Sequence, residues 1–235
     1  MHFTKTSNSN EENMDLQIIY EDNKMFVCNK PTGVLAQSGK SFDVDMVSAL
    51  MTYRKKKGED TFVGVINRLD RQVSGLMVFA KTKQEAAILN KLMQQKEFDK
   101  HYYAVVCGKL VEGKDTFEDY LLKDGNTNTS TVASKDSKDA KFAKLDYEVI
   151  KSIVDEKTGK SLTLVNIHLI TGRHHQIRVQ FAARRLALVG DTKYGNTDNV
   201  IMNNSNGIAL CAYSLQIGKQ KFEIDPEDSI FKLFD

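Results

Sequence analysis

The sequence predicts an α+β protein built around a mixed, mostly antiparallel sheet. Short apolar runs occur in pairs separated by turn residues, which is typical of β-hairpins. Three longer stretches have the apolar spacing of helices. Because hairpins and helices follow one another without a regular strand–helix repeat, the pattern favours an α+β fold in which helices and loops flank the sheet.

The chain opens with a predicted hairpin. Residues 16–20 and 24–28 are two apolar runs, and the polar residues 21–23 between them supply the turn. The segment 30–33, Lys-Pro-Thr-Gly, then ends the second strand in a loop, because proline and glycine interrupt regular structure.

Two helices are predicted in the first half of the chain. Residues 43–57 have helical spacing, and their buried face is expected to carry Val44, Val47, Leu50 and Met51. The second helix begins at the capping-box sequence of residues 82–85 and runs to about Glu97. Its inward side chains are expected to be Ala86, Leu89, Leu92 and Met93.

The rest of the chain predicts mainly strands. Residues 113–140 are the exception, because this polar stretch indicates an irregular, exposed region with at most short strands. One more helix is predicted at residues 173–186. The remaining predicted elements are strands at 62–66, 75–80, 102–107, 144–154, 161–171, 207–217 and 221–224, and a short amphipathic segment at 230–234.

The charge balance does not by itself identify a partner. The 235 residues include 33 Lys and Arg against 31 Asp and Glu, a net charge of +2 that neither requires nor excludes nucleic acid. Basic residues nonetheless cluster at 54–57, at Arg68 and Arg71, and between 173 and 185. The distribution of charge is therefore more informative than its sum.

The ends of the chain and its cysteines predict a cytoplasmic protein. Residues 1–15 are polar and lack the apolar core of a secretory signal, so they predict a disordered lead. No Pro-, Gly- or Ser-rich linker divides residues 16–235, which we expect to form one domain. No apolar run is long enough to span a membrane. The three widely spaced cysteines, Cys28, Cys107 and Cys211, indicate reduced, buried thiols.

Asp70 is the first candidate for chemistry. It lies between Arg68 and Arg71 in a predicted loop, residues 67–74, that connects two strands. Nearby positive charge favours the ionised form of a carboxylate, so Asp70 suits the role of nucleophile or base better than that of proton donor. The alternative is a solvated surface cluster of ion pairs.

A second basic constellation occupies residues 170–178, at a predicted strand-to-helix junction. A helix start and an arginine are both suited to binding phosphate. Arg173 and Arg178 are five residues apart and do not share a helix face, so one is expected to contact phosphate and the other to point into a site. The neighbouring side chains of His174 and His175 are expected to diverge on the helix, which argues against a metal site. The absence of Walker, G-x-G-x-x-G and G-x-S-x-G motifs argues against nucleotide hydrolysis, dinucleotide binding and serine hydrolase chemistry.

Four segments together resemble one family. They are NRLDRQVSGLMVFAK at 67–81, KHYYAVVCG at 100–108, TGRHHQIRV at 171–179 and LVGDTKYG at 188–195. In this order they resemble the RNA pseudouridine synthases of the ribosomal large subunit pseudouridine synthase A type. The resemblance extends over roughly residues 16–218 and implies the catalytic fold of that family.

The resemblance implies a role for each matching residue. Asp70 would be the essential acid residue of the isomerisation, Tyr102 would stack on the target base, and Arg178 would pair with Asp70 and keep it ionised. The expected RNA contacts are Arg68, Arg71, Arg173, His175 and Gln176. The family uses no metal and no cofactor. The substrate here would be a stem-loop of structured rRNA or tRNA. We expect the protein to be a monomer without a domain like that of ribosomal protein S4.

Three positions depart from the family pattern, and two other readings remain open. Asn67 replaces a histidine, Val73 a threonine and Cys211 a histidine. None of them is the Asp, the Tyr or the Arg of the implied site, so activity is expected to survive. The main alternative is an RNA-binding or chaperone module on the same scaffold without turnover. A metal-dependent nuclease is disfavoured because carboxylates do not cluster among the basic motifs.

Overall fold

The computed structural model describes residues 15–38, 44–95, 97–156, 158–195 and 207–235. The predicted lead at 1–15 therefore lies almost entirely outside the described residues. Within them the chain forms one 11-stranded sheet with the path β1-β2-β4-β10-β5-β9-β8-β6-β7, while β3 pairs with β4 and β11 with β10. The strands are β1 Gln17–Glu21, β2 Met25–Lys30, β3 Gly64–Val65, β4 Ser74–Ala80, β5 Phe98–Cys107, β6 Lys114–Asp124, β7 Thr129–Ala133, β8 Lys141–Val154, β9 Ser161–His168, β10 Leu210–Ile217 and β11 Gln220–Glu223.

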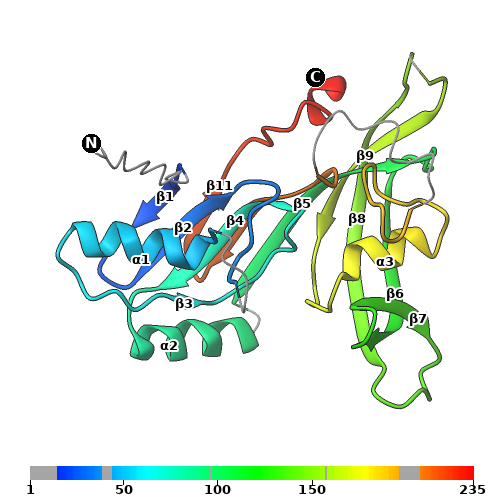
Figure 1. The fold of residues 1–235 in the computed structure, drawn as a ribbon. Coiled ribbons are helices and arrows are strands. Elements are labelled where there is room, and N and C mark those ends of the chain that lie inside the picture. The colour runs from blue at the N-terminus through cyan, green and yellow to red at the C-terminus, as the bar shows by residue number, and fades with distance from the viewer. Residues whose placement is uncertain (1–14, 39–43, 96, 157, 196–206) are drawn as a thin grey trace, which may run out of the picture.

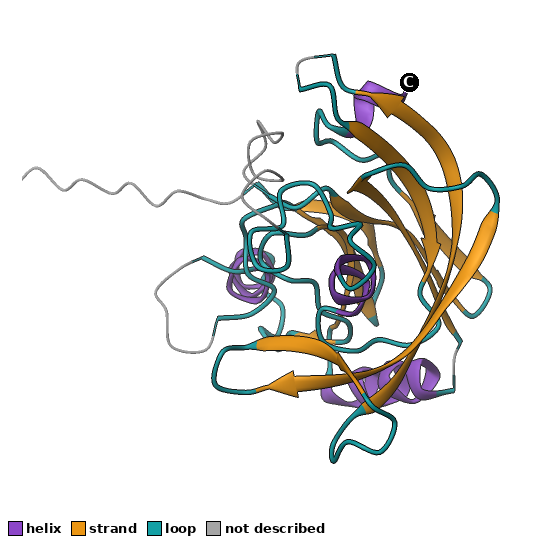
Figure 2. Cartoon of the chain, turned by 90° about the vertical axis from the view of Figure 1, so that its right-hand side faces the viewer, coloured by secondary structure: helices purple, strands orange, loops and turns teal. Residues whose placement is uncertain are grey.

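The described helices are short and flank the sheet. They are α1 Met46–Lys56, α2 Lys83–Gln94, α3 Gln176–Ala182 and a final 3-10 turn at Phe231–Phe234. Figure 1 shows α1 and α2 at one end of the molecule and α3 at the other, with β5 between the two halves. Figure 2 shows that the long strands bend as they cross the molecule. The predicted α+β class with a mixed sheet is confirmed.

The sheet is antiparallel except where β4 and β10 meet. These two strands run parallel through Ser74–Cys211 and Gly75–Ala212 pairs. Gly75 has φ 122°, and a Cβ there would lie 2.5 Å from the backbone nitrogen of Ala212. Because only glycine tolerates both that backbone and that approach, Gly75 allows the two halves of the sheet to join directly behind the loop that carries Asp70.

Helix α1 differs from its prediction in which face it buries. Asp45 is the N-cap, and its side chain accepts a bond from the Ser48 amide in a reciprocal capping box, so the helix starts after Val44. Val44 is 50% exposed and Met51 40% exposed, which contradicts the expectation that both point inward. The buried side chains are Met46, Val47, Leu50 and Arg54.

Helix α2 follows its prediction more closely. The Thr82 side chain accepts a bond from the Glu85 amide, so the expected N-cap is present. Leu89 is buried. The other expected inward residues, Ala86, Leu92 and Met93, are partly buried against the core cluster that contains Leu89.

The predicted irregular stretch at residues 113–140 is wrong, because β6 and β7 lie in it. Strand β6 pairs with β8 along eight successive residues. Only Phe117 and Leu121 of β6 are buried, and Asp119 lies between them at the inward-facing position, paired with Arg184. The outward face of an antiparallel sheet is polar, so a strand is identified in sequence by the apolar residues of its inward face. An acid at an inward position interrupts that alternation.

Two smaller predictions also need correction. The helix expected at 173–186 is only seven residues long, because His175 at φ 53° precedes it and Arg185 at φ 61° follows it in left-handed backbone. Cys28 and Cys211 are buried free thiols as predicted, but Cys107 is only half-buried. Among the described residues, the helices are too short and too polar to cross a bilayer.

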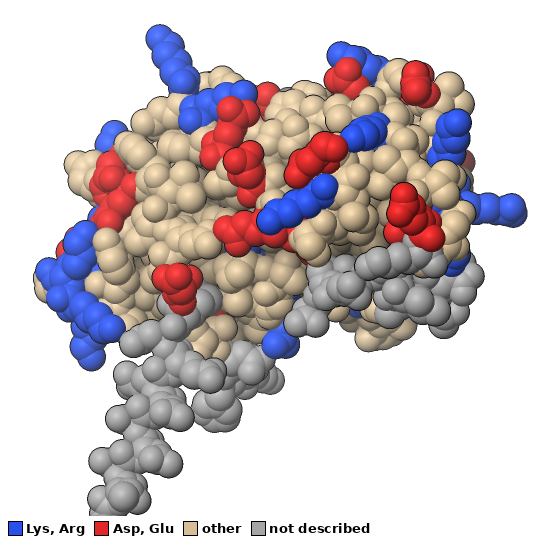
Figure 3. Space-filling model, turned by 90° about the horizontal axis from the view of Figure 1, so that it is seen from above, with Lys and Arg blue, Asp and Glu red and all other residues tan. Residues whose placement is uncertain are grey.

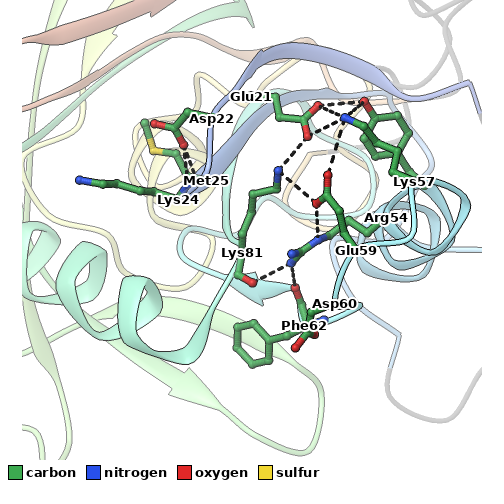
Figure 4. A network of polar contacts seen from close by, with 11 residues as sticks. Glu21, Asp22, Lys24, Met25, Arg54, Lys57, Glu59, Asp60, Phe62 and Lys81 are labelled. Carbon is green, nitrogen blue, oxygen red and sulfur yellow. Dashed lines mark hydrogen bonds and ion pairs between the residues drawn. The ribbon is translucent and has the colours of Figure 1, made fainter.

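A network of ion pairs connects the parts of the N-terminal half; we call it the Glu21 network (Figure 4). Lys81 contacts Glu21 at 2.8 Å and Glu59 at 3.3 Å. Arg54 binds Glu59 at 3.2 Å and also donates to the carbonyl of Lys81 at 2.7 Å. With Lys57 on Glu21 at 3.1 Å, the network ties the end of β1 to α1 and to the end of β4.

Candidate active site

The loop between β3 and β4 carries Asp70, and the loop is anchored at both sides of this residue. Leu69 and Val73 are 9% and 2% exposed and pack into the main core. Asn67 donates to the Leu76 carbonyl at 3.2 Å and accepts from the Val78 amide at 2.7 Å. The asparagine that departs from the family pattern therefore fixes the start of the loop to β4.

A second loop, which follows β2, holds the loop of Asp70 in place by hydrogen bonds. The amide of Gly33 donates to the Arg71 carbonyl at 2.8 Å, and Arg71 Nε returns a bond to the Gly33 carbonyl at 2.8 Å. Lys30 is fully buried, and its Nζ donates to the carbonyls of Pro31, Val34 and Arg71. Burial lowers the pKa of Lys30 to about 7, although the charge of Asp70 opposes that shift.

Arg178 is the guanidinium that contacts Asp70. It projects from α3, is 4% exposed, and its Nη1 donates to Asp70 Oδ2 at 2.6 Å. The two residues are 108 positions apart, so the ion pair joins the β3–β4 loop to the far half of the sheet. The contact that the resemblance implies is present.

Asp191 holds Arg178 from the other side. Its carboxylate accepts from Arg178 Nε at 2.7 Å and from Nη2 at 2.9 Å, a bidentate pair. The amides of Lys193 and Tyr194 also donate to Asp191, which is fully buried. Burial alone would lower the pKa of the Arg178 guanidinium, but the bonds and charges of Asp191 and Asp70 raise it, so Arg178 is a permanent cation.

His175 approaches Asp70 from a third direction. Its Nε2 lies 3.4 Å from Asp70 Oδ2, and its Nδ1 lies 2.7 Å from the Tyr194 hydroxyl. That hydroxyl accepts from the Ser130 amide, so it is free to donate to Nδ1 and leave the His175 proton on Nε2, facing Asp70. Burial, only partly opposed by the charge of Asp70, lowers the pKa of His175 to about 4. His175 is therefore neutral near pH 7.

The prediction that His174 and His175 diverge is wrong. Their rings stack with centroids 3.7 Å apart, because both residues precede α3 and His175 has left-handed backbone. Arg178 Nη1 and His175 Nε2 together face one oxygen of Asp70, while its side chain keeps 31% exposure. We call Asp70, Arg178, Asp191, His175 and Tyr194 the Asp70 site.

Tyr102 lies in β5 on the core face of the sheet. Its side chain belongs to the main core cluster and the residue is 6% exposed. Burial raises the pKa of the Tyr102 hydroxyl, and the negative charge of Asp70 raises it further. Both effects favour the neutral hydroxyl, which is electrostatically coupled to Asp70.

The five residues expected to contact RNA divide into two groups. Arg68, Arg71 and Arg173 are exposed. His175 instead faces Asp70, and Gln176 is 3% exposed. The Gln176 side chain accepts from Thr171 and the Arg173 amide and donates to Lys144 and Gln180, so it positions the turn before α3 and is closed to a ligand. The expectation of RNA contact at Gln176 does not agree with this geometry.

The surface charge is mixed on the face seen from above. Acidic and basic side chains are interspersed there (Figure 3). A net charge of +2 is consistent with such a surface. Steering of a polyanion toward this face would be weak, so binding would depend on local arginines rather than on a broad basic field.

The carboxylates of the Asp70 site are held by a guanidinium, which disfavours a bound cation there. The two carboxylates, Asp70 and Asp191, are both occupied by the guanidinium of Arg178. A metal ion between them would have to displace a buried cation, which is electrostatically unfavourable. The expectation of a site without a cofactor stays a prediction.

Three structurally important residues were not among the predicted site residues. Asp191 and Tyr194 belong to the quoted segment 188–195, and Lys30 belongs to the loop segment 30–33. The usable signal for Asp191 was a carboxylate directly after an apolar run, since a buried acid requires a partner. The sequence does not say which cation that partner is.

Comparison with solved structures defines the fold. Human RNA Pseudouridylate Synthase Domain Containing 1 aligns with TM-score 0.75 and 22% identity, covering 94% of this chain and 86% of that one. Human RNA Pseudouridylate Synthase Domain Containing 4 aligns with TM-score 0.72 and 19% identity, covering 90% and 89%. The fold is that of pseudouridylate synthase domains.

Sequence comparison defines the family. The family model described as RNA pseudouridylate synthase matches residues 24–183, so the chain belongs to this family, and its relatives are of the ribosomal large subunit type. "Ribosomal large subunit pseudouridine synthase C" of Rickettsia prowazekii is 31% identical over 202 residues, 86% of this chain and 63% of that protein. An uncharacterized RNA pseudouridine synthase of Bacillus subtilis is 32% identical over 188 residues, 80% of this chain and 60% of that protein. The chain thus spans about three fifths of the length of these relatives.

Proposed function

We propose that the protein isomerises uridine to pseudouridine in structured RNA, with Asp70 as the reacting carboxylate. The observation that carries the proposal is the setting of Asp70. Its carboxylate is partly exposed, while the cation that holds it, Arg178, is buried and fixed by Asp191. A carboxylate held in this way keeps a fixed position and can still meet a ligand.

The reaction breaks the bond between C1′ and N1, turns the base, and forms a bond between C1′ and C5. The hydrogen on C5 leaves to solvent and N1 takes up a proton, so substrate and product are isomers. Asp70 can act by attacking the sugar or base, or by removing the C2′ proton to give a glycal. Neither route requires a cofactor.

Each neighbouring residue has a defined part in the proposal. The uridine leaves its stack to reach Asp70, and Tyr102 offers an aromatic wall that offsets part of the cost. Arg178 and neutral His175 orient the carboxylate through Oδ2. Arg68, Arg71 and Arg173 are exposed and suited to backbone phosphates.

The substrate class follows from the family and from the surface. Single-stranded loops of folded RNA present bases that can be splayed out, which favours a stem-loop in ribosomal or transfer RNA. The names of the relatives favour ribosomal RNA. A monomeric state, a cytoplasmic location and a single catalytic domain over residues 16–235 remain predictions.

Tritium release tests the function directly. Purified protein is incubated with ribosomal and transfer RNA transcripts that carry 5-tritiated uridine, without added metal or nucleotide. The expected result is release of tritium to water and none from Asp70→Asn. RNA binding without release from either substrate would contradict the proposal and favour the alternative, an RNA-binding module without turnover.

A further inference from the structure

A second group of ionisable side chains lies on the sheet face opposite to Tyr102. Asp99 and His101 are two residues apart on β5, so they project from the same face, and Tyr102, the next residue along the strand, projects from the other. His168 on β9 is the direct cross-strand partner of His101. The group thus lies outside the Asp70 site, although the two share strand β5.

The potential ligand atoms of this group converge. One nitrogen from each of His101 and His168 and a carboxylate oxygen of Asp99 all lie within 4.8 Å of one another. The His101 Nε2–Asp99 Oδ2 distance is 3.3 Å, and the His168 Nε2–Asp99 Oδ1 distance is 2.6 Å. Two ligands about 2.0–2.1 Å from a tetrahedral zinc ion lie about 3.3 Å apart, which matches the first distance. The second distance is shorter, so His168 and Asp99 would move apart on binding.

The rings are arranged so that a small movement completes the site. The imidazoles of His101 and His168 are nearly parallel, with centroids 4.7 Å apart. Their side chains are 28% and 39% exposed, so neither is locked by packing. Rotation about the broad χ2 torsion of histidine brings both Nε2 atoms toward one point.

The Asp99 carboxylate has one oxygen without a hydrogen bond within the described part of the chain, although the side chain as a whole is 43% exposed. Its Oδ1 is shielded from solvent and accepts no hydrogen bond from the described residues, even though His168 Nε2 is only 2.6 Å away. The contact is close but poorly aligned for a hydrogen bond. A shielded carboxylate oxygen in this state costs free energy unless a further group satisfies it.

A neighbouring carboxylate is placed to orient one of the rings. Asp146 on β8 is the cross-strand partner of His168, and its Oδ2 lies 4.0 Å from His168 Nδ1. Thr116 donates to Asp146 Oδ1 at 2.6 Å and fixes that carboxylate. Histidines that bind metal through one nitrogen commonly donate the other N–H to a carboxylate; at 4.0 Å this pair is not hydrogen-bonded, and a small movement of the ring would form that bond.

We propose that Asp99, His101 and His168 form a binding site for a divalent transition-metal ion of the zinc class. Two imidazoles and one carboxylate are a typical three-residue zinc donor set, with water as the fourth ligand. The bound ion would cross-link β5 to β9 on the back of the strand that carries Tyr102. Hard cations such as Mg²⁺ are not expected to compete, because they prefer oxygen ligands.

Titration of the chelator-treated full chain with ZnCl₂ tests the proposal. We expect one equivalent of zinc to bind, with a Tm that rises with the logarithm of the zinc concentration above Kd, and no effect of MgCl₂. His101→Gln, His168→Gln and Asp99→Asn should each remove both effects. Asp146→Asn should weaken binding about 10- to 100-fold, as expected for a carboxylate that orients a ligand.

The neighbouring histidines His174 and His175 offer a matched control. His174→Gln should leave zinc binding unchanged, because that ring lies at the Asp70 site. Substitution of Co²⁺ provides a readout that does not require a variant, since the intense visible absorption of a tetrahedral Co²⁺ complex should appear in the wild type. Zinc binding that survives all three ligand substitutions, or a wild type that binds no zinc, would overturn the proposal.

Discussion

The Glu21 network and the Asp70 site are both built from ion pairs, but they differ in how completely their carboxylates are bonded. In the Glu21 network every carboxylate oxygen of Glu21 is bonded, with Oε1 receiving Lys57 and Lys81 and Oε2 receiving Tyr53. In the Asp70 site the described residues bond only Oδ2 of Asp70, while Asp191 is saturated. Asp70 therefore has a carboxylate oxygen, Oδ1, that the described residues leave without a bond.

The difference teaches how a functional ion pair can be distinguished from a structural one. The central cation of each group is buried, with side chains of Lys81 and Arg178 only 7% and 5% exposed. What differs is how completely the anion is bonded. Glu59 is as exposed as Asp70, at 31%, but its Oε2 lies 3.2 Å from Arg54 and its Oε1 3.8 Å from Lys57, whereas the described residues bond only Oδ2 of Asp70. Burial of the cation holds the geometry, and the unbonded oxygen of the anion can meet a ligand.

The largest expected effect is that of Asp70→Asn on turnover. The variant removes the reacting carboxylate but keeps the side-chain shape, and Arg178 keeps its bidentate partner Asp191. We expect tritium release to fall below detection while RNA affinity stays within about tenfold, or about 1.4 kcal/mol. Anisotropy binding and tritium release measure the two quantities. Full activity in this variant would contradict the proposed chemistry.

Asp191→Ala should affect both stability and turnover. The substitution leaves a buried guanidinium with one partner, so the free energy of unfolding should fall by about 3–5 kcal/mol. Arg178 would also lose the bond pair that positions it, and kcat should fall about 100-fold with RNA affinity unchanged. Urea unfolding and single-turnover kinetics check this. A loss of stability with kcat unchanged would show that Asp191 does not position the site.

Lys81→Met should affect the Glu21 network and leave the Asp70 site unchanged. It removes the buried cation between Glu21 and Glu59 but keeps the apolar stem over the Phe26 ring. We expect a loss of about 3 kcal/mol in unfolding free energy, since a partly buried carboxylate pair is left with fewer cations. At temperatures where the variant is folded, kcat should equal that of the wild type. A reduced kcat there would mean that the Glu21 network is coupled to the Asp70 site.

Acid should weaken the two groups in different pH ranges. The pKa of His175 is lowered from 6.5 to about 4, so folding favours the neutral ring and stability is lost as the pH falls from 6.5 toward 4. For Glu21, burial alone would raise the pKa, but bonds from Lys81, Tyr53 and Lys57 lower it from 4.5 to about 2. Its contribution is complete above pH 4.5 and is lost as the pH falls toward 2.

Matched variants assign these two ranges. Urea unfolding across a pH series should show a smaller loss between pH 6.5 and 4 in His175→Gln than in the wild type. Glu21→Gln should instead reduce the loss between pH 4.5 and 2. The same variant removing both losses would contradict the assignment.

The smallest expected effect is that of Lys57→Ala. Lys57 belongs to the Glu21 network but its side chain is 43% exposed, and Glu21 keeps its bonds from Lys81 and Tyr53. Exposed ion pairs contribute little because water screens them. We expect no resolvable change in the urea midpoint or in kcat. A loss of unfolding free energy as large as that of Lys81→Met would show that the exposed members of the network contribute as much as the buried ones.

The sequence by itself determined the fold class, the family resemblance and the place of Asp70 in a loop between strands. These features depend on local order along the chain, on hairpin spacing, on helix caps such as Thr82 and on the four quoted segments. The strand β6 escaped detection because Asp119 occupies an inward position, where its partner Arg184 is 65 residues away. Local patterning cannot register a charge that is neutralised from a distant segment.

Only the tertiary structure brings these charges together. The arginines next to Asp70 in sequence suggested its setting, and the family resemblance pointed to Arg178; the structure contains that bond, across 108 positions. The pairing of His101 with His168 likewise exists only because β5 and β9 adopt one register out of several. Strand register and loop anchoring are set by packing of the whole core, so the electrostatics of the site follow from the fold and not from neighbours along the chain.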